Sequence, residues 1–328
     1  MSNELALLGR DLFGEVIKRK ATGPVAERFT FPPFTVLDAR AGEWQERKRS
    51  WLAMGIKSWD GRQAAEGKDG LGDTCVTPMS YFNNGKTIAG DSGSIFDPVL
   101  CELAYRWFSP AQGQIVDPFC GGSVRGIVAK ALGLRYWGCD LRPEQVAANV
   151  AQAEEIFDGY EGHSQGLPAM GGEELYWACG DSLEMLDGAP EADFVFSCPP
   201  YGDLEKYSSD PADLSNMEWH TFVAAYKRII LRTVGRMKQD SFACFVVGDF
   251  RDPKGLHRNF VSTTIDAFEE CGARLYNEAI LATAVGTAAL RVTRQFEAGR
   301  KLVKLHQNVL VFCKGDWRKA AEKCAGRD

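Results

Sequence analysis

The sequence predicts a doubly wound α/β fold with a mainly parallel sheet that closes on an antiparallel last strand. From about Ser94 onward, short apolar runs alternate with segments of helical periodicity. Two of these runs stop abruptly, one at a Gly-Gly turn (121–122) and the other at a Pro-Pro pair (199–200). The run Phe242–Val247 is almost continuously apolar, as expected for a strand with helices on both faces. This succession is typical of an open α/β sheet.

The expected elements follow in chain order. Strands are predicted over 114–118, 135–140, 176–179, 193–197 and 242–247, with a closing pair over 275–281 and 308–312. Helices are predicted over 124–132, 143–157, 217–237 and 259–270, and Pro143 occupies a first turn, where proline is favoured. Ligands of such sheets bind beyond the carboxyl ends of the strands. The motifs described below all fall at those ends.

The chain divides into four parts. Residues 1–63 form an N-terminal accessory segment with expected helices at 4–20 and 43–54, and residues 64–93 form a loop containing six glycines. Residues 94–316 are expected to form the main α/β domain, and 317–328 a C-terminal tail. Trp44 and Trp51 lie seven residues apart on one helical face. Packing against the domain is favoured for them over contact with nucleic acid.

Composition bounds the class of protein. The net charge of −6 argues against a surface that is basic all over, so any nucleic-acid contact must come from local patches. The ten cysteines include no Cys-x-x-Cys pair, which disfavours a zinc ribbon or a disulfide framework, and no metal site is predicted. Residues 1–20 do not resemble a signal peptide, and no run of eighteen apolar residues occurs. We therefore expect a cytoplasmic protein without a membrane span.

Three consecutive strand ends predict a cofactor site. Gly121 and Gly122 permit a close backbone approach to a ligand, and the following helix directs its N-terminal N–H groups at it. Asp140 ends the second strand, where a carboxylate can accept both hydroxyls of a ribose. Asp181 follows the third strand and is placed to accept from an adenine amino group. The alternatives are helix-capping aspartates beside a simple turn, and a nicotinamide site.

Two segments resemble the motifs of one enzyme family. Asp117-Pro118-Phe119-Cys120-Gly121-Gly122 is similar to D-P-F-x-G-x-G, and Ser197-Cys198-Pro199-Pro200-Tyr201 is similar to Asp/Asn/Ser-Pro-Pro-Tyr/Phe. These are motifs of the S-adenosylmethionine (SAM)-dependent DNA amino-methyltransferases, which act on adenine-N6 or cytosine-N4. The segments 94–98 and 306–312 resemble the family's stretch before the SAM motif and its last strand, so the resemblance covers about 94–314. The stretch 44–49 resembles phage-encoded members.

The resemblance implies a Rossmann-like class I SAM-dependent methyltransferase fold, SAM as cofactor and a set of site residues. The cofactor-binding positions are Phe96, Asp117, Phe119, Gly121, Gly122, Ser123, Asp140, Leu141, Asp181 and Ser182. The catalytic positions are Ser197, Cys198, Pro199, Pro200 and Tyr201. In the family, the residue before the prolines and a backbone carbonyl accept hydrogen bonds from the target amine, and the aromatic residue stacks on the flipped base.

The chain departs from the family pattern at two positions. Ser123 replaces the second glycine of G-x-G, which is tolerable if this position has a negative φ. Cys198 occupies the acceptor position, although a thiol is a weak acceptor. Ser197 or a backbone carbonyl could take over this role, or the thiol could suffice. A cysteine nucleophile, as in carbon-5 cytosine methylation, is a further alternative, disfavoured because those enzymes carry proline before cysteine.

The region 283–307 shows no clean periodicity and carries five basic residues against Glu297. A phosphate-binding loop beside the active site is favoured over a solvated loop. Its bases are Arg291, Arg294, Arg300, Lys301 and Lys304. The segment 203–217 resembles a lid that orders on substrate binding.

The expected partner is double-stranded DNA, bound by a monomer or a homodimer with a protective role, as in restriction-modification, or a regulatory one. A methyltransferase of RNA or of protein amides, and a non-catalytic DNA-binding relative, remain alternatives.

Overall fold

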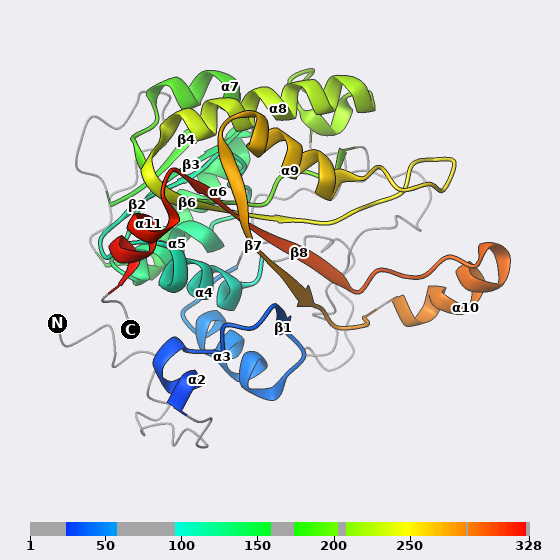
Figure 1. Ribbon diagram of the computed structural model, residues 1–328, viewed down its shortest axis with the longest axis horizontal. Helices are drawn as coiled ribbons and strands as arrows, with labels where there is room; N and C mark the ends of the chain where they lie inside the picture. Colours follow the sequence, from blue (N-terminus) through cyan, green and yellow to red (C-terminus); the bar gives the residue numbers. More distant parts are fainter. Residues whose placement is uncertain (1–23, 58–95, 159–173, 203–207, 287, 326–328) are drawn as a thin grey trace.

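A computed structural model describes residues 24–57, 96–158, 174–202, 208–286 and 288–325 (Figure 1). The helix expected at 4–20 and the loop 64–93 lie outside the described residues. So does the first part of the expected lid, at 203–207.

The centre of the molecule is an eight-stranded sheet with the order β1-β7-β8-β6-β5-β2-β3-β4 (Figure 1). Strand β8 runs antiparallel to both of its neighbours, and the other pairs are parallel. The doubly wound, mainly parallel sheet with an antiparallel last strand is therefore confirmed. The strands are β1 (Val36–Asp38), β2 (Gln114–Asp117), β3 (Arg135–Asp140), β4 (Leu175–Cys179), β5 (Ala192–Ser197), β6 (Met237–Val247), β7 (Ala273–Ala282) and β8 (His306–Lys314).

Helices cover both faces of this sheet. On one side lie α7 (Ser182–Met185), α8 (Trp219–Arg236) and α9 (Phe260–Glu270), and on the other α4 (Pro98–Phe108), α5 (Val124–Ala131) and α6 (Pro143–Ile156) (Figure 1). Residues of the central strands alternate between the two cores, so that Phe194 and Phe196 pack with α4 while Val195 faces the layer of α8. A short helix, α2 (Pro24–Phe29), precedes β1.

The strand order changes direction between β2 and β5. From β2 the chain winds outward through β3 to β4, and it then returns to the other side of β2 as β5 and β6. The turn after Asp117 and the segment after Ser197 therefore leave adjacent strands at the same sheet edge. Such a switch point leaves a crevice above the carboxyl ends of the strands, where ligands of α/β sheets bind.

The N-terminal segment is packed onto the main sheet. Strand β1 pairs with β7, and helix α3 (Gly42–Leu52) buries Trp44 and Trp51, which confirms packing for both tryptophans. Two carboxylates hold α3 in place, one at the N-cap of α4 (Asp97) and one inside α4 (Glu102). Asp97 accepts from the Trp44 indole (3.2 Å) and from the Lys48 ammonium (3.1 Å).

The second carboxylate, Glu102, accepts from Trp51 (2.9 Å) and from the Arg47 Nε (2.6 Å). Burial acts to raise the pKa of Glu102, but Arg47 and Arg106 outweigh it and leave that pKa below the usual value. Sequence periodicity could not reveal these pairs, because their members lie about fifty positions apart.

Two segments near the C-terminus differ from expectation. The region 283–307, expected as a loop, contains helix α10 (Ala288–Gly299), which projects from the body in Figure 1. The loop expectation was wrong: these residues form an amphipathic helix, although most of its apolar side chains, for example Leu290 and Phe296, are exposed and not packed in the core. Within 317–328, expected as a tail, helix α11 (Trp317–Cys324) buries Ala320.

Candidate functional site

The turn that follows β2 is built as the sequence suggests. Gly121 has a φ of 50°, in the left-handed region that favours glycine. Ser123 has a φ of −66°, so a side chain is tolerated where the family motif has its second glycine. The turn is tied to its surroundings: the Ser182 hydroxyl donates to the Pro118 carbonyl (2.5 Å) and the Asn149 amide donates to the Gly121 carbonyl (2.7 Å).

The two predicted cofactor aspartates lie at neighbouring strand ends. Asp140 ends β3, and its Oδ1 accepts from the Arg142 backbone N–H (2.9 Å). Asp181 follows β4 and caps α7 by accepting from the Leu183 N–H (2.9 Å). Both aspartates are half-buried, as are Gly122 and Leu141. All four residues lie at the same sheet edge, where β2, β3 and β4 end.

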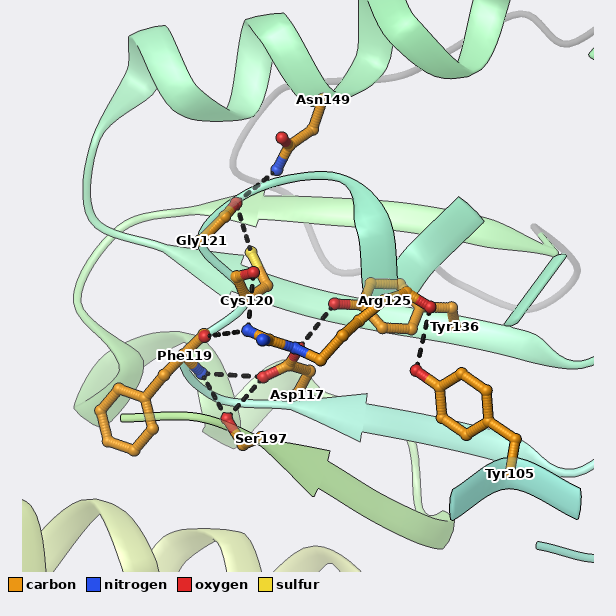
Figure 2. Close-up of polar contacts among 9 residues, drawn as sticks. All are labelled: Tyr105, Asp117, Phe119, Cys120, Gly121, Arg125, Tyr136, Asn149 and Ser197. Carbon is orange, nitrogen blue, oxygen red and sulfur yellow. Dashed lines mark hydrogen bonds and ion pairs between the residues drawn. The ribbon is translucent and has the colours of Figure 1, made fainter. Parts of the chain in front are cut away.

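Asp117 lies behind this turn (Figure 2). The residue is fully buried, and each carboxylate oxygen takes two protein donors. Oδ1 accepts from the Ser197 hydroxyl (2.6 Å) and the Phe119 N–H (3.2 Å), while Oδ2 accepts from Arg125 (2.5 Å) and the Tyr136 hydroxyl (2.8 Å). All its acceptor positions are thereby satisfied, so Asp117 shapes the turn from within the protein.

The predicted aromatic positions flank the turn on its two sides. Phe119 packs against Tyr226 with ring centroids 6.0 Å apart, in the α8 layer. Phe96 packs edge-on against Phe196 at 5.7 Å, in the α4 layer. Both rings are half-buried and can contribute apolar walls to a ligand site.

The segment 198–201, which the sequence predicts to be catalytic, leaves β5 directly beside this turn. The Ser197 hydroxyl, which donates to Asp117, also accepts from the Phe119 N–H (3.2 Å), and Ser197 is fully buried. This geometry disfavours Ser197 as the acceptor for a substrate amine. Cys198 is half-buried with its thiol 4.0 Å from the Tyr201 hydroxyl, and Pro199 and Pro200 follow it.

Tyr201 is held by partners from distant parts of the chain. Its hydroxyl accepts from the Gln307 amide on β8 (2.9 Å), and its ring meets Phe250 and Phe260 edge to face at 6.3 and 6.1 Å. The ring remains half-buried. A fixed, half-exposed aromatic ring is suited to stacking on a planar ligand.

The predicted basic residues divide between two places. Arg291 and Arg294 lie on α10, and Arg300 and Lys301 follow it. Lys304 lies near Tyr201, because both side chains approach Gly248: a Cβ built on this glycine would lie 3.5 Å from the Lys304 Cε and 4.0 Å from the Tyr201 ring. Partial burial lowers the pKa of Lys304, although the negative charge of Asp249 acts to raise it.

The loop between β6 and α9 joins this basic surface, which sequence reasoning missed. The Lys301 side chain packs against Gly255: if this glycine carried a Cβ, that atom would lie 2.6 Å from the Lys301 Nζ. The loop 251–258 and the segment after α10 are therefore in contact. Arg251 donates to the Gly255 carbonyl (2.8 Å), and the Arg258 guanidinium lies 5.0 Å from the Trp219 ring centre. A basic cluster in the sequence 251–258 was the only available signal.

Sequence reasoning also missed Arg125, Tyr136 and Gln307. Arg125 offered one signal, since it is a lone charge in the apolar start of α5. Tyr136 and Gln307 offered none, because only the arrangement of strands in the sheet brings their partners to them.

Comparisons with known proteins give likeness of fold. No protein-family model and no curated protein sequence matches the chain. Among solved structures, TrmN from Thermus thermophilus is 13% identical with a TM-score of 0.42, over 67% of this chain and 49% of TrmN, so the chain spans about half of that protein.

Magnesium protoporphyrin IX methyltransferase (ChlM) from Synechocystis PCC 6803, solved with bound SAM, is 10% identical with a TM-score of 0.37 over 63% of this chain and 71% of ChlM. A second Thermus thermophilus protein, assigned as a DNA modification methylase, is 17% identical with a TM-score of 0.31, over 42% of this chain and 51% of its own. These likenesses are too distant to assign a reaction. Among the described helices, none has the length and apolarity needed to cross a membrane.

Proposed function

We propose that the chain is a SAM-dependent methyltransferase of exocyclic amino groups in DNA, on cytosine-N4 or adenine-N6. The observation that carries the proposal is the meeting of the Gly turn and the Cys-Pro-Pro-Tyr segment at the switch point, joined by the Ser197–Asp117 hydrogen bond (2.6 Å). One segment has the geometry of a nucleotide cradle, and the other presents rigid acceptors beside an aromatic ring.

The cofactor fits the residues present. The N–H groups at the start of α5 suit the methionine carboxylate of SAM, Asp140 suits the ribose hydroxyls, and Asp181 suits the adenine amino group. When bound, SAM supplies an electrophilic methyl group on a sulfonium. Phe96 and Phe119 stand on the two sides of the turn that would hold it.

The catalytic segment would activate the amine. An aryl amine is a poor nucleophile because its lone pair is delocalised into the ring, and acceptors for both N–H bonds localise it. Ser197 is engaged with Asp117, so the acceptors left are the Cys198 thiol and the backbone carbonyls of 198–200. As the new N–C bond formed and the S–C bond broke, the nitrogen would become cationic and would release one proton to solvent. Tyr201 would hold the flipped base.

A nucleic acid is favoured as substrate over a protein amide by the basic surface beside Tyr201, formed by Lys304, Lys301 and the loop 251–258. RNA carries the same phosphate charge and remains the second candidate, and a protein amide does not call for this surface. Mass spectrometry of nucleosides from DNA of an expressing host tests the proposal. The appearance of N4-methylcytosine or N6-methyladenine supports it, and methylation confined to RNA or peptide substrates contradicts it.

Cys198 is expected to act as a hydrogen-bond acceptor and not as a nucleophile. Replacing it by serine, in Cys198→Ser, supplies a better acceptor of similar size, so turnover should be kept or increased. Cys198→Asp or Cys198→Asn restores the commoner family residue and should shift preference toward adenine. Methylation assays with nucleoside mass spectrometry measure both effects.

The covalent alternative makes opposite predictions. It requires Cys198→Ser to be inactive and the wild-type enzyme to form a stable adduct with DNA containing a fluorinated cytosine. An inactive Cys198→Ser enzyme that still binds SAM and DNA would remove the acceptor role. Cys271 is another half-buried thiol and lies after α9, so Cys271→Ser is a matched control that should leave turnover unchanged.

The basic residues of α10 and its C-terminal flank are expected to bind phosphate. Each lost contact should reduce the slope of log K against log salt by about 0.9 without changing sequence preference. Binding of one duplex by wild type and by the variant with alanine at Arg291, Arg294, Arg300 and Lys301 measures this. An unchanged slope would make the segment merely solvated. Arg232→Ala, on α8 and paired with Asp187, is the control for a basic residue elsewhere.

A further inference from the structure

Arg125 is a buried cation at the centre of the candidate site (Figure 2). It lies in the first turn of α5, and its side chain is 5% exposed. Nε donates to Asp117 (2.5 Å), and Nη2 donates to the carbonyls of Phe119 (2.6 Å) and Cys120 (2.8 Å). The guanidinium also lies over the Phe96 ring, with the Arg125 Cζ 4.6 Å from the ring centre. Every one of these partners belongs to the cofactor-binding region or adjoins it.

These bonds fix the direction of the turn's peptide groups. In a trans peptide the carbonyl and the following N–H point to opposite sides. Because Arg125 draws the Phe119 carbonyl inward, the Cys120 N–H points the other way, where it donates to the Cys139 carbonyl (2.9 Å). The Cys120 carbonyl is drawn inward too, so the Gly121 N–H is directed away from Arg125. Arg125 therefore sets the orientation of the backbone at the start of the Gly turn.

The same residue also reaches the catalytic segment. Asp117, which takes the Arg125 bond on one oxygen, takes the Ser197 hydroxyl on the other (2.6 Å). Ser197 immediately precedes Cys198, so the position of the acceptor depends on the orientation of the Asp117 carboxylate.

Stability alone is a weak reason for such an arrangement. Removing two charges from water costs nearly as much as their attraction returns, and apolar side chains often replace buried ion pairs without loss. A guanidinium, however, offers several N–H donors in one rigid plane, which an ammonium cannot do. Arg125 donates to three acceptors within the short segment 117–120, so we assign it the role of fixing the geometry of the turn.

We propose that Arg125 is a positioning residue that holds the cofactor-binding turn and the Cys198-Pro199-Pro200-Tyr201 segment in one fixed arrangement. What these two segments bind rests on the proposed function. The arrangement itself is a property of this chain, and it can be measured without a nucleic-acid substrate.

The first test is SAM affinity by calorimetry for Arg125→Lys and Arg125→Met. Lysine keeps the charge but reaches fewer acceptors, so both variants should bind SAM at least tenfold more weakly. Arg47→Lys and Arg47→Met are matched controls, because Arg47 also pairs with a buried carboxylate, Glu102 (2.6 Å), on α4. The controls should lower Tm and leave the Kd for SAM within twofold of wild type.

The second test follows the catalytic segment through the rate of alkylation of Cys198 by iodoacetamide, read by peptide mapping, with Cys271 as the internal standard. Arg125→Lys should raise the Cys198 rate several-fold, and so should Ser197→Ala. The double variant should show no further increase, because both changes break one connection.

Wild-type SAM affinity and wild-type Cys198 reactivity in Arg125→Lys would overturn the proposal, whatever the change in Tm. If Arg125→Met does not fold, the lysine variant decides. A wild-type enzyme that binds SAM but methylates no DNA would overturn the proposed substrate and leave Arg125's role standing. A wild-type chain that binds no SAM would overturn the proposed function, and Cys198 reactivity would then decide alone.

Discussion

Asp140→Ala is expected to weaken SAM binding by about 2–4 kcal/mol, roughly 30- to 1,000-fold in Kd, since hydrogen bonds from two ribose hydroxyls to a charged group are lost. The carboxylate stands at the carboxyl end of β3, and in the same register β4 ends at Cys179, two positions before Asp181. Asp140→Asn retains one acceptor and should lie between wild type and alanine. Calorimetry on folded protein measures all three.

The capping alternative for Asp140 has its own control. Asp140 accepts from a backbone N–H two residues on, and so does Asp316, which caps α11 and accepts from Arg318 (2.8 Å). Asp316→Ala should lose only the cap, about 1 kcal/mol of stability, and keep its SAM affinity. If Asp140→Ala behaves as Asp316→Ala does, with lower Tm and unchanged Kd, Asp140 is a cap and not a cofactor ligand.

The sheet could be predicted because its signals are local. β3 begins and ends where expected, at Arg135 and Asp140, since an apolar run between turn residues defines it. β6 begins at Met237, five residues before the expected Phe242, because its first part is polar at the sheet end. The three-residue β1 carries too few positions for any alternation, and only pairing with β7 makes it a strand.

The candidate site was predictable in outline but not in its division of roles. The motif residues do meet at one edge, as strand order requires. Asp117 reads in the sequence as a cofactor residue, yet four protein donors enclose it, and Ser197 reads as an acceptor for substrate but donates to Asp117. Which partner satisfies a buried polar group is a tertiary property, since Arg125, Tyr136 and Ser197 reach Asp117 from three separate elements.

Tyr201→Ala is expected to lower turnover by roughly 5- to 150-fold, which corresponds to the 1–3 kcal/mol that one base gains by stacking on an aromatic ring. The loss of stability should be smaller, because the ring is half-buried and meets Phe250 and Phe260 only edge to face. Assays well below the variant's Tm separate the two effects. Tyr201→Phe and Tyr201→Trp keep a planar face and should retain most of the activity.

The stacking role of Tyr201 can also be tested by changing Gln307, which donates a hydrogen bond to the Tyr201 hydroxyl. Gln307→Leu removes the same 2.9 Å hydrogen bond as Tyr201→Phe and leaves the ring in place. If the hydroxyl only orients the ring, these two variants should show the same modest loss, and combining them should add nothing. Two results would contradict the stacking role: a turnover of Tyr201→Ala no lower than that of Tyr201→Trp, or a turnover of Tyr201→Phe as low as that of Tyr201→Ala. Either result would assign the chemistry to the hydroxyl, which lies 4.0 Å from the Cys198 thiol. Tyr201 would then act on the reacting amine and not as a platform for the base.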